Sequence, residues 1–183
     1  MGKRALLNID YTIDFVAEDG NLTCGEPGQK LEESIARITE DFIEAGDEVF
    51  FAIDAHVEGD DLHPESKLFP PHNIIGTSGR ELYGRLADVY ENNKHLSHVH
   101  YFDKTRYSAF VGTELELKLR ERGITELHLV GVCTDICILH TAVDAYNKGF
   151  DIVVHKNGVA SFNAAGHDWA LGHFEATLGG KVV

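Results

Sequence analysis

The sequence predicts a three-layer α/β/α sandwich built on a mainly parallel sheet. Short apolar runs alternate along the chain with longer amphipathic segments, as in a protein made of repeated β-α-β units. The apolar runs are continuous rather than alternating, which is typical of strands buried on both faces of a parallel sheet. Three amphipathic segments stop at a glycine shortly before an apolar run begins, the usual exit from a helix. We therefore expect one α/β domain over residues 1–183.

Five strands and five helices are expected in order along the chain. The strands are Ala5–Ile9, Val49–Ile53, His98–Phe102, Glu126–Val132 and Asp151–Val154. The helices are the stretches from Leu31 to Gly46, Gly79 to Tyr90, Leu115 to Gly123, Ile138 to Gly149 and His167 to Leu178. In the last helix, Trp169 and Phe174 are expected on the buried face.

Composition narrows the functional classes. Thirty acidic residues against sixteen Lys and Arg give a net charge of -14, which disfavours a nucleic-acid partner because the phosphate backbone would repel it. No stretch approaches the roughly 18 consecutive apolar residues of a membrane span, and the first apolar run is too short for a signal peptide. Three cysteines, an odd number, argue against a disulfide framework. We expect a cytoplasmic protein with neither a nucleic-acid nor a membrane partner.

Reactive side chains follow four of the predicted strands. In strand order they are Asp10, then Asp54 with His56, then Lys104, then Cys137. Ligands of open parallel sheets bind beyond the carboxyl ends of the strands, so we expect these side chains to lie together on one rim. Each alone has an ordinary alternative as a cap, a solvated strand end or a small buried residue.

Cys137 is the candidate nucleophile of this rim. The segment from Gly131 to Cys137 leaves a strand and enters a helix, which places Cys137 in the first helical turn. The helix dipole and free N–H groups there favour a thiolate and can bind an oxyanion. A nearby Lys104 would lower the pKa of the thiol, and Asp10 could accept its proton and return it to a leaving amine.

A metal site is predicted around Asp54 and His56. Alternate residues of an extended segment point the same way, so both side chains can face one ion. The long irregular stretch that follows, residues 57–77, supplies further donors: His63, Glu65 and His72. Mixed imidazole and carboxylate ligands suit Zn²⁺, Mn²⁺ or Fe²⁺. The alternative is a polar surface loop, because eleven histidines make chance clusters common.

Aromatic residues follow the reactive segments and can enclose a flat ring. They are Phe15, Phe69, Tyr107 and Phe110. Because most aromatic side chains belong to the core, this observation carries weight only together with the reactive residues.

Together these motifs resemble the isochorismatase-like cysteine hydrolases, and within them the nicotinamidases, over nearly the whole chain. The matching segments are Asn8–Phe15, Asp54-Ala55-His56, Lys104 and Gly131–Cys137. The resemblance implies a catalytic triad of Asp10, Lys104 and Cys137. It also implies a cis peptide between Val132 and Cys133, with the backbone N–H groups of Cys133 and Cys137 forming an oxyanion hole.

The resemblance further implies a cofactor and a substrate. One divalent ion, Zn²⁺ or else Mn²⁺ or Fe²⁺, would bind the ring nitrogen of nicotinamide. Its ligands would be Asp54, His56, Glu65 and His72, with His63 as the alternative to Glu65. The substrate pocket would be formed by Phe15, Phe69, Tyr107 and Cys133. Nicotinamide would be hydrolysed to nicotinate and ammonia through a cysteine thioester. Many relatives have Gln at the position of Thr12.

Two other functions stay open. One is a metal-independent amidohydrolase that acts on another small amide, such as a carbamoyl or ureido compound. The other is a non-catalytic binding module, since a fold does not fix a function. The expected partner is a small molecule, and a homo-oligomer is possible.

Overall fold

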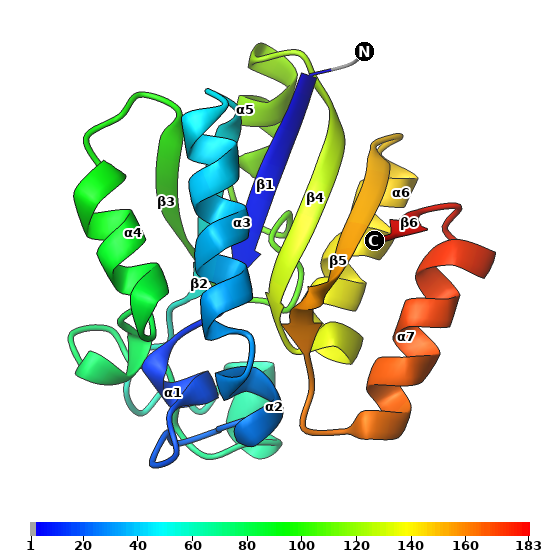
Figure 1. Cartoon of the computed structure of the whole chain (residues 1–183). Coiled ribbons are helices and arrows are strands. Elements are labelled where there is room, and N and C mark those ends of the chain that lie inside the picture. The colour runs from blue at the N-terminus through cyan, green and yellow to red at the C-terminus, as the bar shows by residue number, and fades with distance from the viewer. Residues whose placement is uncertain (1–2) are drawn as a thin grey trace.

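The middle layer of the fold is a six-stranded parallel sheet, seen in the computed structural model of Figure 1, which describes residues 3–183. Residues 1 and 2 of the predicted domain lie outside this range. The strand order is β3-β2-β1-β4-β5-β6. The strands are β1 (Lys3–Ile9), β2 (Glu48–Asp54), β3 (Val99–Lys104), β4 (Ile124–Val132), β5 (Asp151–Ala160) and β6 (Lys181–Val182). All registered pairs are parallel.

Helices cover both faces of this sheet. The main helices are α3 (Glu32–Glu44), α4 (Arg85–Asn93), α5 (Leu115–Glu121), α6 (Leu139–Asn147) and α7 (Ala164–Ala176). Short turns of helix are α1 (Ile13–Val16), α2 (Glu26–Gln29), η1 (Pro64–Lys67), η2 (Ser78–Arg80) and η3 (Thr134–Ile138). Within residues 3–183, none of the helices has the length and apolarity needed to cross a membrane.

The buried side chains form two hydrophobic clusters, and each cluster includes residues of a different set of helices. Leu6 of β1 belongs to the cluster that α3 and α4 close, whereas its neighbour Leu7 belongs to the cluster that α5, α6 and α7 close. In Figure 1, α3 and α4 accordingly lie on the near side of the sheet and α5 and α6 behind it. The predicted three-layer α/β/α sandwich is confirmed.

The boundaries of some elements differ from the prediction. The helix expected from Gly79 begins only at Arg85, because η2 and an extended stretch precede it, and Leu82 in that stretch pairs with Thr12. Strand β5 continues to Ala160, and β6 is a two-residue strand that was not expected.

Trp169 was wrongly placed on the buried face of the last helix. Its side chain is 57% exposed and stacks on the ring of His173, with 4.6 Å between the ring centroids. Phe174 is fully buried, as expected.

The strand order reverses between β1 and β4, which makes their carboxyl ends the ligand-binding crevice of such a sheet. Gly131 lets the two strands meet closely at this point. It has a φ of 123°, and a Cβ on it would collide with the backbone carbonyl of Ile9. The carboxyl ends of β2 and β3 lie on the same rim, beside β1.

Candidate active site

Three of the predicted reactive side chains meet at the crevice. Asp10 directly follows β1, Lys104 is the last residue of β3, and Cys137 lies in the η3 turn after β4. The Nζ atom of Lys104 is 2.7 Å from Oδ2 of Asp10 and 3.8 Å from Sγ of Cys137. A carboxylate oxygen of Asp10 also lies within 4.8 Å of that sulfur. All three side chains are buried. The arrangement places a thiol, a carboxyl group and an ammonium in mutual contact.

Lys104 is shared between two carboxyl groups with different pKa values. Its Nζ also lies 2.6 Å from Oδ1 of Asp54, and the two carboxylates hold the pKa of Lys104 well above its usual range despite its burial. Burial, followed by the charge of Asp54, raises the pKa of Asp10 to about 7, although Lys104 opposes this. Burial would also raise the pKa of Asp54, but Lys104 and His56 outweigh it and lower the pKa. Asp10 can therefore exchange a proton near neutral pH.

The environment of Cys137 differs from the expected one. Burial raises the pKa of its thiol well above the usual range. Lys104 lowers that pKa, as predicted, but the carboxylates of Asp10 and Asp54 act against it. The predicted lowering of the thiol pKa is therefore not found, because burial outweighs the effect of Lys104. Attack by the sulfur then requires a proton acceptor, and Asp10 is the adjacent carboxyl group.

The turn that carries Cys137 has the predicted backbone. The peptide between Val132 and Cys133 is cis. Cys137 lies in the π-helical turn η3, which leads without a break into α6. The N–H groups of Ile136 and Ile138 both donate to the carbonyl of Cys133, at 3.1 and 3.2 Å, which closes the turn.

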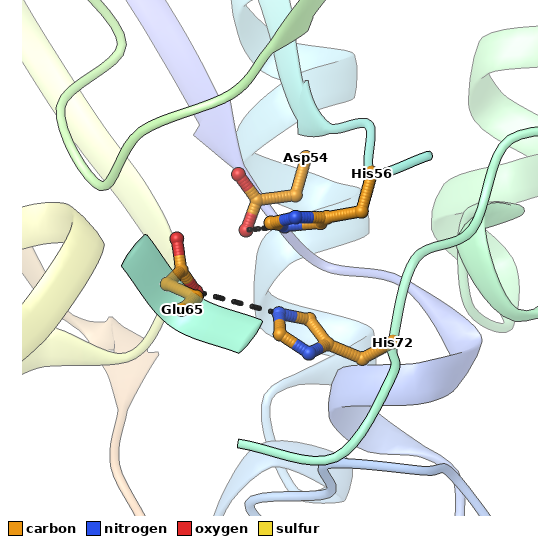
Figure 2. A group of neighbouring side chains, drawn as sticks. All are labelled: Asp54, His56, Glu65 and His72. Carbon is orange, nitrogen blue, oxygen red and sulfur yellow. Dashed lines mark ion pairs between the residues drawn. The ribbon is translucent and has the colours of Figure 1, made fainter. Parts of the chain in front are cut away.

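A second cluster consists of the four predicted metal ligands. Figure 2 shows Asp54, His56, Glu65 and His72 converging from β2, η1 and the loops that follow them. One ligand atom of each lies within 4.8 Å of those of the others. Oδ2 of Asp54 is 3.7 Å from Nε2 of His56, and Oε2 of Glu65 is 3.5 Å from Nε2 of His72.

The cluster fits a divalent cation. All four side chains are buried, and Oδ2 of Asp54 and the Nε2 atoms of His56 and His72 have no hydrogen-bond partner. Buried polar atoms without partners are rare and call for an ion, a water or a ligand. Two imidazoles and two carboxylates form a donor set that suits a transition metal such as zinc.

His63 lies beside this cluster rather than in it. Its Nε2 is 2.7 Å from the carbonyl oxygen of Thr105, and its Nδ1 accepts a hydrogen bond of 3.2 Å from the N–H of Glu65. Its ring packs edge-on against that of His56, with 4.6 Å between centroids. Both ring nitrogens are therefore engaged, whereas the carboxylate of Glu65 faces the other ligands.

A single pocket borders both clusters. Its lining residues are Phe15, Leu22, Asp54, Glu65, Phe69, Tyr107, Val132, Cys133, Ile136, Cys137 and Phe162. The four residues predicted to contact a substrate are among them. Phe110 is not, because it stacks on Phe150 in the core, 5.9 Å between centroids.

Several lining residues were missed from the sequence. Phe162 follows the carboxyl end of β5, so the rule that found Asp10 and Lys104 could have found it too. Val132 and Ile136 lie within the recognised cysteine motif, but the motif does not reveal which of its side chains face the pocket. Leu22 comes from an irregular loop and carries no signal.

Comparison with known proteins agrees with this geometry. The isochorismatase domain family matches residues 4–183. The chain is 64% identical over 181 residues to the isochorismatase family protein PncA of Bacillus subtilis (strain 168), covering 99% of each chain. It is similar to the crystal structure of nicotinamidase/pyrazinamidase PncA from Bacillus subtilis, with a TM-score of 0.98, 64% identity and 99% of each chain covered. Pyrazinamidase of Pyrococcus horikoshii in complex with zinc has a TM-score of 0.86 and 25% identity, over 99% of this chain and 98% of that one.

Proposed function

The chain belongs to the isochorismatase family, and on this basis we propose that it is a nicotinamidase, which hydrolyses nicotinamide to nicotinate and ammonia. The names of its similar relatives support an amide substrate with a ring nitrogen. The proposal rests above all on one observation, which is that the thiol of Cys137 and the carboxylates of Asp54 and Glu65 line the same small pocket.

The shape of the pocket suits a flat heteroaromatic amide. Phe15, Phe69 and Tyr107 form apolar walls against which a ring can pack. The amide group would lie at Cys137 and the ring nitrogen would point to the metal cluster. When bound, a divalent ion supplies a Lewis acid for the ring nitrogen and so orients the substrate.

The first half of the reaction forms a thioester. Asp10 accepts the proton of the Cys137 thiol as the sulfur attacks the amide carbon. Lys104 stays charged and stabilises the carboxylate and the developing thiolate. The oxyanion would accept hydrogen bonds from the backbone N–H groups of Cys133 and Cys137. Asp10 then gives its proton to the amide nitrogen, the C–N bond breaks, and ammonia leaves.

The second half of the reaction hydrolyses that thioester. Asp10, again ionised, accepts a proton from the attacking water, and the C–S bond breaks to give nicotinate. The proton returns to the sulfur, so Cys137 and Asp10 end in their starting states. A carboxyl group with a pKa of about 7 suits this alternation, because both protonation states are accessible at neutral pH.

The metal cluster favours this function over a metal-independent amidohydrolase. Such an enzyme would have no use for three buried donor atoms that lack hydrogen-bond partners beside its pocket. A binding module without activity would have no use for a buried ammonium between two carboxylates and a thiol.

The direct test is ammonia release from nicotinamide by the purified protein. We expect turnover that a chelator abolishes and that added Zn²⁺ or Mn²⁺ restores. Benzamide is the matched control, because it has the same amide but no ring nitrogen, and it should be hydrolysed far more slowly. A metal-loaded protein that releases no ammonia from nicotinamide would overturn the proposal. Undiminished turnover after complete metal removal would overturn its metal-dependent part.

A further inference from the structure

Two residues other than glycine adopt a left-handed backbone within residues 3–183, and both border the site. Asp10 has a φ of 57° and Asn73 a φ of 44°. Asp and Asn adopt this conformation more readily than other residues with a Cβ, and local hydrogen bonds offset its cost. Asp10 is the proposed acid and base, and Asn73 directly follows the proposed metal ligand His72.

Thr12 contacts both of these residues. Its N–H donates to the carbonyl of Asp10 at 2.9 Å, and its hydroxyl donates to Oδ1 of Asn73 at 2.9 Å. Thr12 and Asn73 are both fully buried, so water does not compete for this hydrogen bond. The Nδ2 atom of Asn73 has no partner, which leaves the Thr12 hydroxyl as the one side-chain anchor of its amide among the described residues.

The backbone of Asn73 connects this anchor to the metal ligands. Its N–H donates to Oδ2 of Asp14 at 2.7 Å, and its carbonyl accepts from the N–H of His56 at 3.1 Å. Asn73 is therefore hydrogen-bonded to the backbone of His56 and joined to His72 by a peptide bond. A displacement of Asn73 would move both imidazoles.

We propose that Thr12 is a positioning residue for the metal site. Its hydroxyl holds Asn73 in the left-handed conformation, and Asn73 in turn fixes His56 and His72. This inference rests on the proposed metal-dependent function. Partners that orient metal ligands without touching the ion typically change metal affinity by about 10–100-fold when they are removed.

The test is Zn²⁺ binding to the metal-free proteins, measured by competition with a chromophoric chelator. Thr12→Val keeps the shape but removes the hydroxyl, and it should weaken binding by about 10–100-fold. Thr12→Ser keeps the hydroxyl and should bind close to wild type. Thr12→Ala provides the same deletion in a smaller residue if Thr12→Val does not fold.

Thr39→Val is the matched control. Thr39 is equally buried, and its hydroxyl donates to the carbonyl of Ile35 in α3 at 2.7 Å and lies 3.2 Å from Oδ1 of Asn8, neither of which is a proposed metal ligand. Its loss should lower thermal stability but leave Zn²⁺ affinity unchanged. Circular dichroism of each metal-free variant separates a loss of fold from a loss of affinity.

A double-mutant cycle tests the route through Asn73. Asn73→Gly accepts a positive φ but has no side chain for Thr12 to hold. In that background Thr12→Val should have no further effect on Zn²⁺ affinity. Equal weakening in both backgrounds, or wild-type affinity in Thr12→Val, would overturn the inference. No substrate is used in this test. A protein that binds Zn²⁺ but does not hydrolyse nicotinamide would therefore contradict the proposed function and leave the inference about Thr12 standing.

Discussion

The ammonium of Lys104 lies 2.6 Å from Oδ1 of Asp54, and both side chains are buried. This ion pair joins the two halves of the site, since Lys104 belongs to the proposed triad and Asp54 to the proposed metal ligands. The same carboxylate therefore offers one oxygen to the ammonium and leaves the other, Oδ2, without a partner and facing the cluster. The carboxylate of Asp54 thus links the charge of Lys104 to that of the metal cluster.

Lys104→Met should destabilise the fold as well as abolish activity. It would leave the carboxyl groups of Asp10 and Asp54 buried without their partner, a change that typically costs about 3–5 kcal/mol. Urea unfolding measures the loss. Lys94→Met, which breaks the exposed ion pair with Glu91, is the control and should change stability little. Equal stability of the two variants would contradict a structural role for the Lys104 ion pair.

The reactivity of Cys137 toward iodoacetamide should fall when Lys104 is removed. Lys104 is the group that lowers the pKa of this thiol, so the thiolate fraction at a given pH is smaller without it. In the wild-type protein, labelling should rise steeply with pH, because burial raises the thiol pKa well above its usual range. Mass spectrometry of the cysteine-containing peptides gives the rates. Identical rates in wild type and Lys104→Met would argue against electrostatic support of the thiolate.

Cys137→Ala should abolish ammonia release while leaving the fold intact. Cys133→Ala should keep measurable activity, because only its backbone N–H is proposed to act. The comparison is made at equal metal content, with melting temperatures as a check of folding. Full activity of Cys137→Ala would end the covalent mechanism.

The metal content of three variants tests the ligand assignment. His56→Ala should purify metal-free and nearly inactive, because His56 is held just beyond the end of β2. Glu65→Ala should bind metal more weakly and regain some activity in excess metal, since water can partly replace a loop ligand. His63→Ala should keep its ion, because the His63 nitrogens bond to Thr105 and to the N–H of Glu65. Loss of the ion in His63→Ala but not in Glu65→Ala would reverse the assignment.

His155 should make the fold sensitive to mild acid. Burial, then the charges of His128 and Arg4, lowers the pKa of His155 from 6.5 to about 4. Between these values the unfolded chain binds a proton that the folded protein does not, so stability is complete above pH 6.5 and falls as the pH drops toward 4. His155→Gln should flatten this decline in urea unfolding measured from pH 7 to pH 4. An unchanged slope would show that His155 does not contribute.

The rim of reactive residues could be predicted from the sequence because parallel strands bring their carboxyl ends to one edge. That rule placed Asp10, Lys104 and Cys137 without any knowledge of side-chain packing. It could not separate Glu65 from His63, since both lie in the same irregular stretch of the sequence. The structure distinguishes them, because the His63 nitrogens bond to Thr105 and to the N–H of Glu65, whereas the Glu65 carboxylate lies among the other candidate ligands.

Other features depend on packing that periodicity does not encode. The pKa of the Cys137 thiol is raised because the effect of burial exceeds the opposing effect of Lys104. The sequence reveals the lysine but not the burial. Trp169 was misplaced because α7 is apolar around much of its circumference, so spacing alone does not identify its buried face.

The strand order also determines when the protein can become active during its synthesis. β1 ends at Ile9, but its neighbour β4 begins only at Ile124, so one edge of β1 stays unpaired while most of the chain leaves the ribosome. A nascent chain at that stage already holds Asp10, Lys104 and the proposed metal ligands, yet it lacks Cys137, the proposed nucleophile. Such an apolar strand edge is also where unfinished chains would associate with one another. The last third of the chain therefore both supplies the thiol and covers this edge of β1.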